Sequence, residues 1–185
     1  MKQSTNEELK EDSSEAGKSA ALPDAKDMAT SLISYKEWTK SALTQRLLKR
    51  GCIQADIDVA MVWLEEQGLI DDRKYAFEFA SSRMRTRLWG IIKISAELKK
   101  RGIDATLAQE ATTSLKGETE EAAALAALQK WLRIKRFTPP LSSAVAFKAS
   151  SHLRSKGFTG QAIGFAMNNN NNECPEEYPV VYEDQ

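Results

Sequence analysis

Hydrophobic positions recur at helical spacing along most of the chain, and one short phrase closes three of the helical stretches. The phrase is a leucine, two variable positions, a basic residue and a glycine, and it occupies residues 47–51, 98–102 and 153–157. A leucine stripe that runs into a basic turn and a glycine is typical of a helix C-terminus, because cations suit the negative end of the helix dipole and glycine adopts the left-handed cap. The phrase recurs after 51 and 55 residues. Such a period indicates helical units that stack into an elongated body.

The residues that follow each glycine also correspond between the three copies. An apolar residue comes first, a second one follows after five or six positions, and an alanine follows after nine. The matching sets are Ile53, Ile103 and Phe158, then Ile57, Leu107 and Ile163, then Ala60, Ala111 and Ala166. Further helical stretches begin at Asp71 and in the alanine-rich segment 118–136, and no segment shows the alternation of a strand. The pattern predicts an all-α, elongated array of three tandem three-helix repeats that resemble helix-turn-helix units.

The boundaries of these repeats follow from the recurring phrase. We place repeat 1 at residues 31–87, repeat 2 with its connecting helix at 88–136 and a degenerate repeat 3 at 137–167. The two flanking segments, 1–30 and 168–185, are polar and acidic and hold few large apolar residues. Because such segments bury too little apolar surface to offset the entropy of ordering, we expect both tails to be disordered.

Charge is distributed unevenly, although the whole chain has 26 basic and 26 acidic residues. Residues 31–167 hold 22 basic and 14 acidic side chains, whereas the two tails hold 4 basic and 12 acidic ones together. The basic groups recur at the expected helix ends, and a curved array could align them along one surface. They are Arg46, Lys49, Arg50, Arg83, Arg85, Arg87, Lys93, Lys99, Lys100, Arg101, Arg154 and Lys156. A body with this excess suits a polyanionic partner, either phosphates or an acidic protein groove.

The chain holds no set of residues that suggests catalysis. His152 is its one histidine, and Cys52 and Cys174 match neither a disulfide framework nor metal-ligand spacing. The nine glycines are scattered and form no loop that would cradle a nucleotide phosphate. Helix capping explains the acidic pair Asp71 and Asp72 better than carboxylate catalysis does. We therefore expect no catalytic residue, no metal, no cofactor and no enzymatic activity, and the lack of a long apolar run predicts no membrane span.

One segment is more specific than the caps. Residues 64–76, Leu-Glu-Glu-Gln-Gly-Leu-Ile-Asp-Asp-Arg-Lys-Tyr-Ala, resemble the signature of the RecX family. Further matches are Ser82-Arg83, the stretch 87–90, the phrase 97–103 and a weaker copy at 153–158, so the resemblance covers about residues 34–167. The chain departs from the family pattern at Leu88 and Ile91, where glycine and proline are common, and in its degenerate third repeat.

The resemblance implies a non-enzymatic negative regulator of the RecA recombinase. Members of the family lodge in the groove of the RecA filament on single-stranded DNA and limit filament extension, ATP hydrolysis, strand exchange and the coprotease activity that triggers the SOS response. We expect the contacts with RecA or with the DNA backbone to come from Arg83, Arg85, Arg87, Trp89, Lys93, Lys99, Lys100 and Arg101. We also expect a monomer in the cytoplasm, associated with the nucleoid, or in a plastid or another organelle if the host is eukaryotic.

Two other functions stay open at this point. Two short helices joined across a glycine turn resemble a DNA-binding helix-turn-helix, which predicts binding to duplex DNA through one recognition helix. Against this, the second helices at 54–67 and 104–115 are acidic or neutral. The other alternative is an α-solenoid scaffold for an unrelated protein, which would bind without any dependence on DNA.

Overall fold

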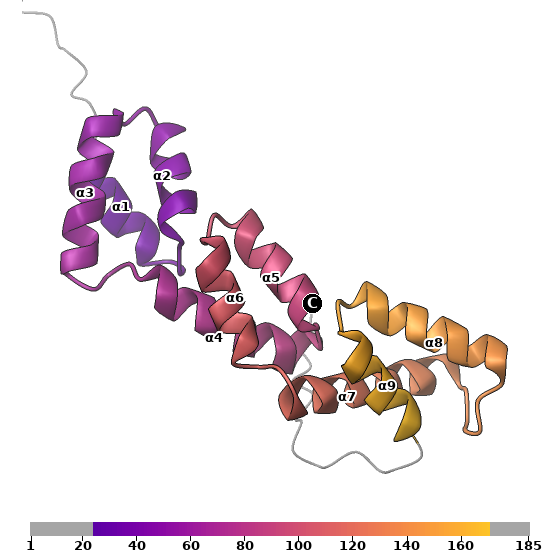
Figure 1. Ribbon diagram of the computed structural model, residues 1–185. Coiled ribbons are helices and arrows are strands. Elements are labelled where there is room, and N and C mark those ends of the chain that lie inside the picture. The colour runs from indigo at the N-terminus through magenta and orange to yellow at the C-terminus, as the bar shows by residue number, and fades with distance from the viewer. Residues whose placement is uncertain (1–23, 171–185) are drawn as a thin grey trace, which may run out of the picture.

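The computed structural model describes residues 24–170, and this part of the chain forms nine α-helices and no strand (Figure 1). The helices are α1 (Ala25–Ile33), α2 (Lys40–Leu48), α3 (Gln54–Glu66), α4 (Asp72–Arg87), α5 (Ile91–Lys100), α6 (Ala105–Thr113), α7 (Glu118–Lys135), α8 (Ser143–Ser155) and α9 (Gly160–Asn168). They group into three units of three helices, α1–α3, α4–α6 and α7–α9, in each of which every helix packs against the other two. The units follow one another along the molecule, so the predicted elongated all-α array is confirmed.

The limits of the units differ from the predicted repeats. Helix α4 packs against α5 and α6, and α7 packs against α8 and α9, so each belongs to the unit that follows it. The recurring phrase marks the end of the second helix of a unit, and counting from phrase to phrase assigned each first helix to the unit before it. The boundaries predicted at 87/88 and 136/137 therefore lie one helix too late.

Helix α1 begins inside the segment 1–30, which the composition predicts to be disordered. Ala25 and Ala29 are buried in the first unit, and the side chain of Asp24 accepts a hydrogen bond from the backbone N–H of Lys26. The larger apolar side chains of α1, Met28, Leu32 and Ile33, also pack against the core of this unit, and two of them lie beyond residue 30, outside the segment predicted to be disordered. The disorder predicted for residues 1–23 and 171–185 lies outside the described residues.

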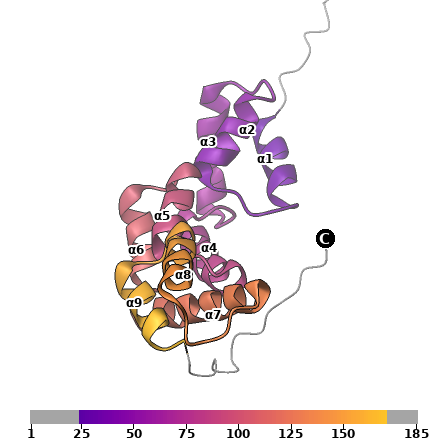
Figure 2. The same ribbon diagram turned by 90° about the vertical axis from the view of Figure 1, so that its right-hand side faces the viewer.

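Buried side chains form two cores. The first unit has its own core, centred on Leu43, Leu47, Ile57 and Leu64. The second and third units share one continuous core, to which α4 to α9 all contribute. Figure 2 accordingly shows α1–α3 at one end of a larger body that contains the other six helices.

Side chains cap the starts of several helices, and the capping predicted for the pair Asp71 and Asp72 is confirmed at Asp71. The side chains of Thr39, Asp71, Asp104 and Thr159 accept hydrogen bonds from backbone N–H groups of the first turn that follows. Gly51, Gly102 and Gly157 follow the second helix of each unit with φ of 90°, 81° and 83°, a backbone conformation that glycine adopts without strain. The predicted glycine caps are confirmed.

The second helices of successive units meet end to end at a joint that occurs twice. In the first joint the hydroxyl of Thr39, the N-cap of α2, donates to the carbonyl of Arg101 at the end of α5 (2.7 Å). The backbone N–H of Lys40 donates to the carboxylate of Asp72 at the start of α4 (2.9 Å). The start of one second helix thus lies against the end of the next one.

The second joint repeats this arrangement with backbone groups. The N–H of Gly90 donates to the carbonyl of Lys156 (2.9 Å), and the N–H of Ile92 donates to the carbonyl of Gly157 (3.0 Å). A buried carboxylate from the start of α7 completes it: Glu120, 1% exposed, accepts from the N–H of Ile91 (3.3 Å). Orphan donors at one helix start and orphan acceptors at another helix end thereby satisfy each other.

Candidate functional site

The described part of the chain holds neither a metal-binding cluster nor a membrane-spanning helix. Within residues 24–170, no three histidine, cysteine, aspartate or glutamate side chains gather closely enough to hold a metal ion. None of the helices over the same range is long and apolar enough to cross a membrane. The predicted contact residues lie on α4, on α5 and at the ends of these two helices.

Two of the three predicted arginines of α4 share a side of the helix, and the third does not. An α-helix turns about 100° per residue, so Arg83 and Arg87 lie one above the other while Arg85 points away from them. Arg85 instead lines a hollow with Phe77 and Ser114. The three arginines that look like one cluster in the sequence are divided between two faces.

The ring of Trp89 makes cation–π contacts with two of the predicted cations. The guanidinium carbon of Arg83 lies 5.8 Å from the centre of the Trp89 ring, and the ammonium of Lys93 lies 4.7 Å from it. Arg83 also lies 5.0 Å from the ring of Phe79, which anchors its side chain on α4. Cations held against aromatic rings in this way lose conformational freedom before any partner binds.

The partly exposed side chain of Arg101 makes several contacts with its own unit. Its Nη1 donates to the hydroxyl of Tyr75 (3.0 Å), its Nη2 donates to the carboxylate of Glu97 (3.2 Å), and its guanidinium lies 4.7 Å from the ring of Phe79. Its carbonyl accepts from Thr39 in the first joint. The side chain of Arg101 thus supports the packing within unit 2, and its backbone carbonyl links unit 2 to unit 1. Lys99 and Lys100 remain exposed in the last turn of α5.

Cations that are far apart in the sequence lie close together at the second joint. The Lys156 ammonium donates to the carbonyl of Arg87 (3.0 Å), which ties the end of α8 to the end of α4. Burial lowers the pKa of Lys156, and the positive charges of Lys130 on α7 and Lys93 on α5 lower it further. We call Arg83, Trp89, Lys93, Lys130 and Lys156 the basic seam, because they line the junction of α4, α5, α7 and α8.

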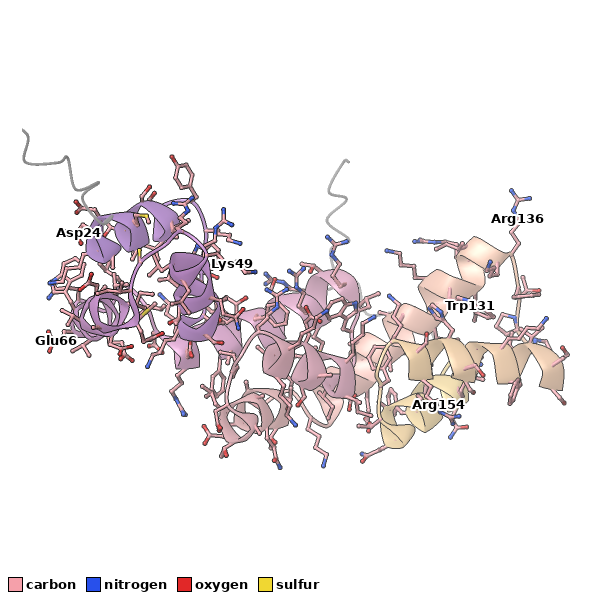
Figure 3. All side chains as sticks on the ribbon, turned by 90° about the horizontal axis from the view of Figure 1, so that it is seen from above. Asp24, Lys49, Glu66, Trp131, Arg136 and Arg154 are labelled. Carbon is pink, nitrogen blue, oxygen red and sulfur yellow. The ribbon has the colours of Figure 1, made fainter. Side chains whose placement is uncertain are left out.

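The seam continues toward an aromatic pair in the third unit. Trp131 on α7 and His152 on α8 stack with their ring centres 5.7 Å apart. Burial lowers the pKa of His152, and Lys156 and Lys135 lower it further. Figure 3 shows Arg136 and Arg154 on opposite sides of the third unit, so the cations of that unit do not all share one face.

The second joint is what brings the seam together. Gly90 and Gly157 approach so closely that a Cβ on either would lie within 3.0 Å of backbone atoms of the other side. Trp89 lies directly before Gly90 and Lys93 lies three residues after it. The contact between the two glycines therefore places both side chains near Lys156. The sequence signal for it is the pairing of glycines in Trp89-Gly90 and Lys156-Gly157, and only the fold shows that the two meet.

The arrangement suits binding to a polyanion. The ammonium groups of Lys130 and Lys93 lie close enough to Lys156 to disfavour its charge, which costs stability in the absence of a partner. Phosphate groups would relieve that repulsion, and the exposed parts of Trp89 and Trp131 could contact bases or sugars.

Comparison with known proteins decides the family. The family model for the second three-helix domain of RecX matches residues 71–111, which correspond to α4–α6. A regulatory protein RecX from Chromohalobacter salexigens is 33% identical over 149 residues, which are 77% of this chain and 90% of that protein. The chain belongs to the RecX family.

Other RecX proteins agree in sequence and in fold. RecX from Halorhodospira halophila is 30% identical over 152 residues, 81% of this chain and 89% of that protein. The crystal structure of RecX from Lactobacillus salivarius superposes with a TM-score of 0.71 at 21% identity, over 80% of this chain and 94% of that one. A second RecX crystal structure gives 0.70 at 24% identity, over 78% and 71%. The array of three-helix units is thus the RecX fold.

Proposed function

We propose that this RecX protein is a non-enzymatic negative regulator of RecA. It binds the filament that RecA forms on single-stranded DNA and inhibits filament extension, ATP hydrolysis, strand exchange and coprotease activity, and so limits the SOS response. It acts in the cytoplasm, where the filament assembles. Family membership and the elongated basic body support this proposal, and the basic seam is the observation that carries it.

The shape of the molecule suits a groove. Three units in a row present a long, narrow body, and the continuous core of units 2 and 3 keeps the seam in one rigid part of it. A helical nucleoprotein filament offers a long groove lined by protein and by phosphates. An elongated protein with a cationic junction near its middle can contact both along such a groove.

The structure of the basic seam changes which residues we propose as contacts with the filament. Arg83, Trp89 and Lys93 keep their assignment to the filament, and Lys130 and Lys156 join them. Lys99 and Lys100, exposed at the end of α5, remain candidates for an adjacent contact. Arg101 moves to a structural role, because its guanidinium binds Tyr75 and Glu97.

The alternative of a helix-turn-helix protein that reads duplex DNA has weaker support. The recognition helix of such a motif inserts into the major groove and carries side chains that contact bases and phosphates. The corresponding third helices here are α3, α6 and α9, and none of them contains a lysine or an arginine. The cations lie instead at the junction between units.

ATP hydrolysis by RecA on single-stranded DNA tests the proposal. We expect hydrolysis to fall as this protein is added, at amounts well below those needed to coat the DNA. Binding to the same DNA without RecA is measured alongside. Unchanged hydrolysis, or inhibition that begins only when the free DNA is saturated, would favour a general DNA-binding protein over a filament regulator.

A further inference from the structure

The end-to-end joints leave one unused face at each end of the array. Each joint places the start of a second helix against the end of the next second helix, so α2 docks on α5 and α5 docks on α8. Among residues 24–170, no helix start docks on the end of α2, at residues 48–53, which we call the acceptor face. Over the same range, the start of α8, at residues 141–143, docks on no helix end, and we call it the donor face. The two faces lie at opposite ends of the molecule (Figure 1).

The acceptor face has the geometry of the joints and open space in front of it. Gly51 has φ of 90°, close to the 81° and 83° of Gly102 and Gly157. A Cβ on Gly102 or Gly157 would lie within 3.0 Å of Ser41 or Lys93, which belong to the helix docked there. A Cβ on Gly51 would meet nothing within 4 Å. The first unit thus keeps the backbone shape that receives a helix start.

Apolar side chains are exposed on this face where the other units place polar ones. Leu48 is 44% exposed and Ile53 is 48% exposed. Counted from the glycine, the second unit has Lys99 and Asp104 at these positions, and the third has Arg154 and Thr159. The buried Cys52, and not Ile53, therefore corresponds to Ile103 and Phe158, which corrects the match made from the sequence. The outer face of a terminal repeat is normally polar, because it must stay in water. At these two positions, this terminal unit exposes apolar side chains where the other two units have polar ones.

The donor face repeats the features of the helix starts that dock. Leu141 and Ser142 occupy the positions that Trp38 and Thr39 take before α2 and that Trp89 and Gly90 take before α5. Thr39 and Gly90 each donate to the next unit, whereas no side-chain capping bond forms at Ser142. Two apolar side chains outside residues 141–143 are also exposed in this unit, Ile134 of α7 at 65% and Phe147 of α8 at 73%.

We propose that copies of this protein associate head to tail, with the donor face of one copy docked on the acceptor face of the next. Such a contact joins two different faces and does not close on itself, so it builds open chains that continue the array. It differs from the monomer that the sequence led us to expect. It does not depend on the proposed function, although end-to-end contact would make binding along a filament groove cooperative.

Sedimentation velocity of the full chain, over a concentration series and without RecA or DNA, tests this association. We expect the average sedimentation coefficient to rise steadily with concentration. Gly51→Asn should abolish that rise, because the new side chain fills the space a docking helix needs, while asparagine tolerates a positive φ better than most residues. Gly68→Asn is the matched control, since Gly68 also has a positive φ and open space but lies away from both faces.

The sedimentation results distinguish head-to-tail association from a monomer and from a closed dimer. A concentration-dependent rise in the wild type and in Gly68→Asn, with Gly51→Asn sedimenting as a monomer of unchanged helicity, supports the proposal. A wild type that stays monomeric at every concentration overturns it, and would fit an end covered by another part of the chain. Association that Gly51→Asn leaves unchanged, or that stops at a dimer, overturns it as well. The absence of RecA keeps this result independent of the proposed function.

Discussion

Lys156 contacts Gly90 through its backbone carbonyl, which accepts the Gly90 N–H at 2.9 Å, and thereby joins the end of α8 to the start of α5. Its side chain continues the same link, because the ammonium donates to the Arg87 carbonyl on α4 at 3.0 Å. The residue that fixes the junction of two units therefore also supplies one charge of the basic seam. Structure and proposed binding depend on the same few contacts.

The close approach of the units at Gly157 predicts a large effect of one added methyl group. Gly157→Ala should lower the free energy of unfolding by about 3 kcal/mol, since left-handed strain and forced overpacking against Lys93 add together. Gly51→Ala carries the strain without the contact and should cost about 1 kcal/mol. Urea denaturation of both variants measures the difference. Equal losses would show that the joint is not as tight as described.

Glu120 should be the main polar support of the second joint. Its carboxylate accepts from the N–H groups of Ile91 and Thr159 and from the Thr159 hydroxyl (3.3, 3.1 and 2.8 Å). Glu120→Ala leaves these donors buried without partners and should cost about 3 kcal/mol. Glu121→Ala, which removes an exposed contact with Gln161, should stay within about 1 kcal/mol. Chemical denaturation gives both values, and a Glu120→Ala variant as stable as the control would contradict this role.

His152 should make stability depend on pH. Its pKa is lowered by burial and by the charges of Lys156 and Lys135, so the unfolded chain takes up its proton more readily than the folded one. The stabilisation is complete above the ordinary histidine pKa of about 6.5 and is lost as the pH falls through that value toward the lower folded pKa. Denaturation midpoints at pH 7.5 and 5.5 test this. His152→Gln should reduce the difference between them, and an unchanged difference would assign the pH effect to other groups.

Lys130 offers a way to separate binding from folding. It is exposed, and it raises the cost of charging Lys156. Lys130→Ala should therefore leave stability within about 0.5 kcal/mol of the wild type or increase it. The same variant should bind single-stranded DNA, free or in the filament, less tightly and with a salt dependence lower by about one phosphate contact. Unaltered affinity and salt dependence would remove Lys130 from the seam.

The array could be predicted from sequence because its signals are local. The Leu98 to Gly102 phrase marks a helix end by charge and by glycine, whatever lies beside it, and the caps at Asp71 and Asp104 act in the same way. The first helix of each unit was harder to assign. Helix α1 spans the end of the polar segment 1–30, so its apolar side chains are divided between that segment and the next one. Helix α4 carries no mark that shows which unit it packs against.

The candidate site was only partly predictable for a related reason. Trp89 and Lys93 are near neighbours in the sequence, so their contact follows from the start of one helix. Lys130 and Lys156 reach them only through the joint, which depends on tertiary packing. The opposite error occurs with Arg83, Arg85 and Arg87, which are close in the sequence but do not share one face. Residues two apart in a helix point in different directions, so Arg85 lies away from the other two.

The most direct test of the account compares two charge-matched triple variants in the RecA ATPase assay on single-stranded DNA. Arg83→Ala/Lys93→Ala/Lys130→Ala removes three cations of the seam, and Arg85→Ala/Lys116→Ala/Lys148→Ala removes three exposed cations outside it. Helicity and denaturation midpoints first establish that both variants fold. We expect the seam variant to lose inhibition by at least an order of magnitude in the concentration required, and the control to inhibit like the wild type. Equal inhibition by the two variants would contradict the assignment of RecA regulation to the basic seam.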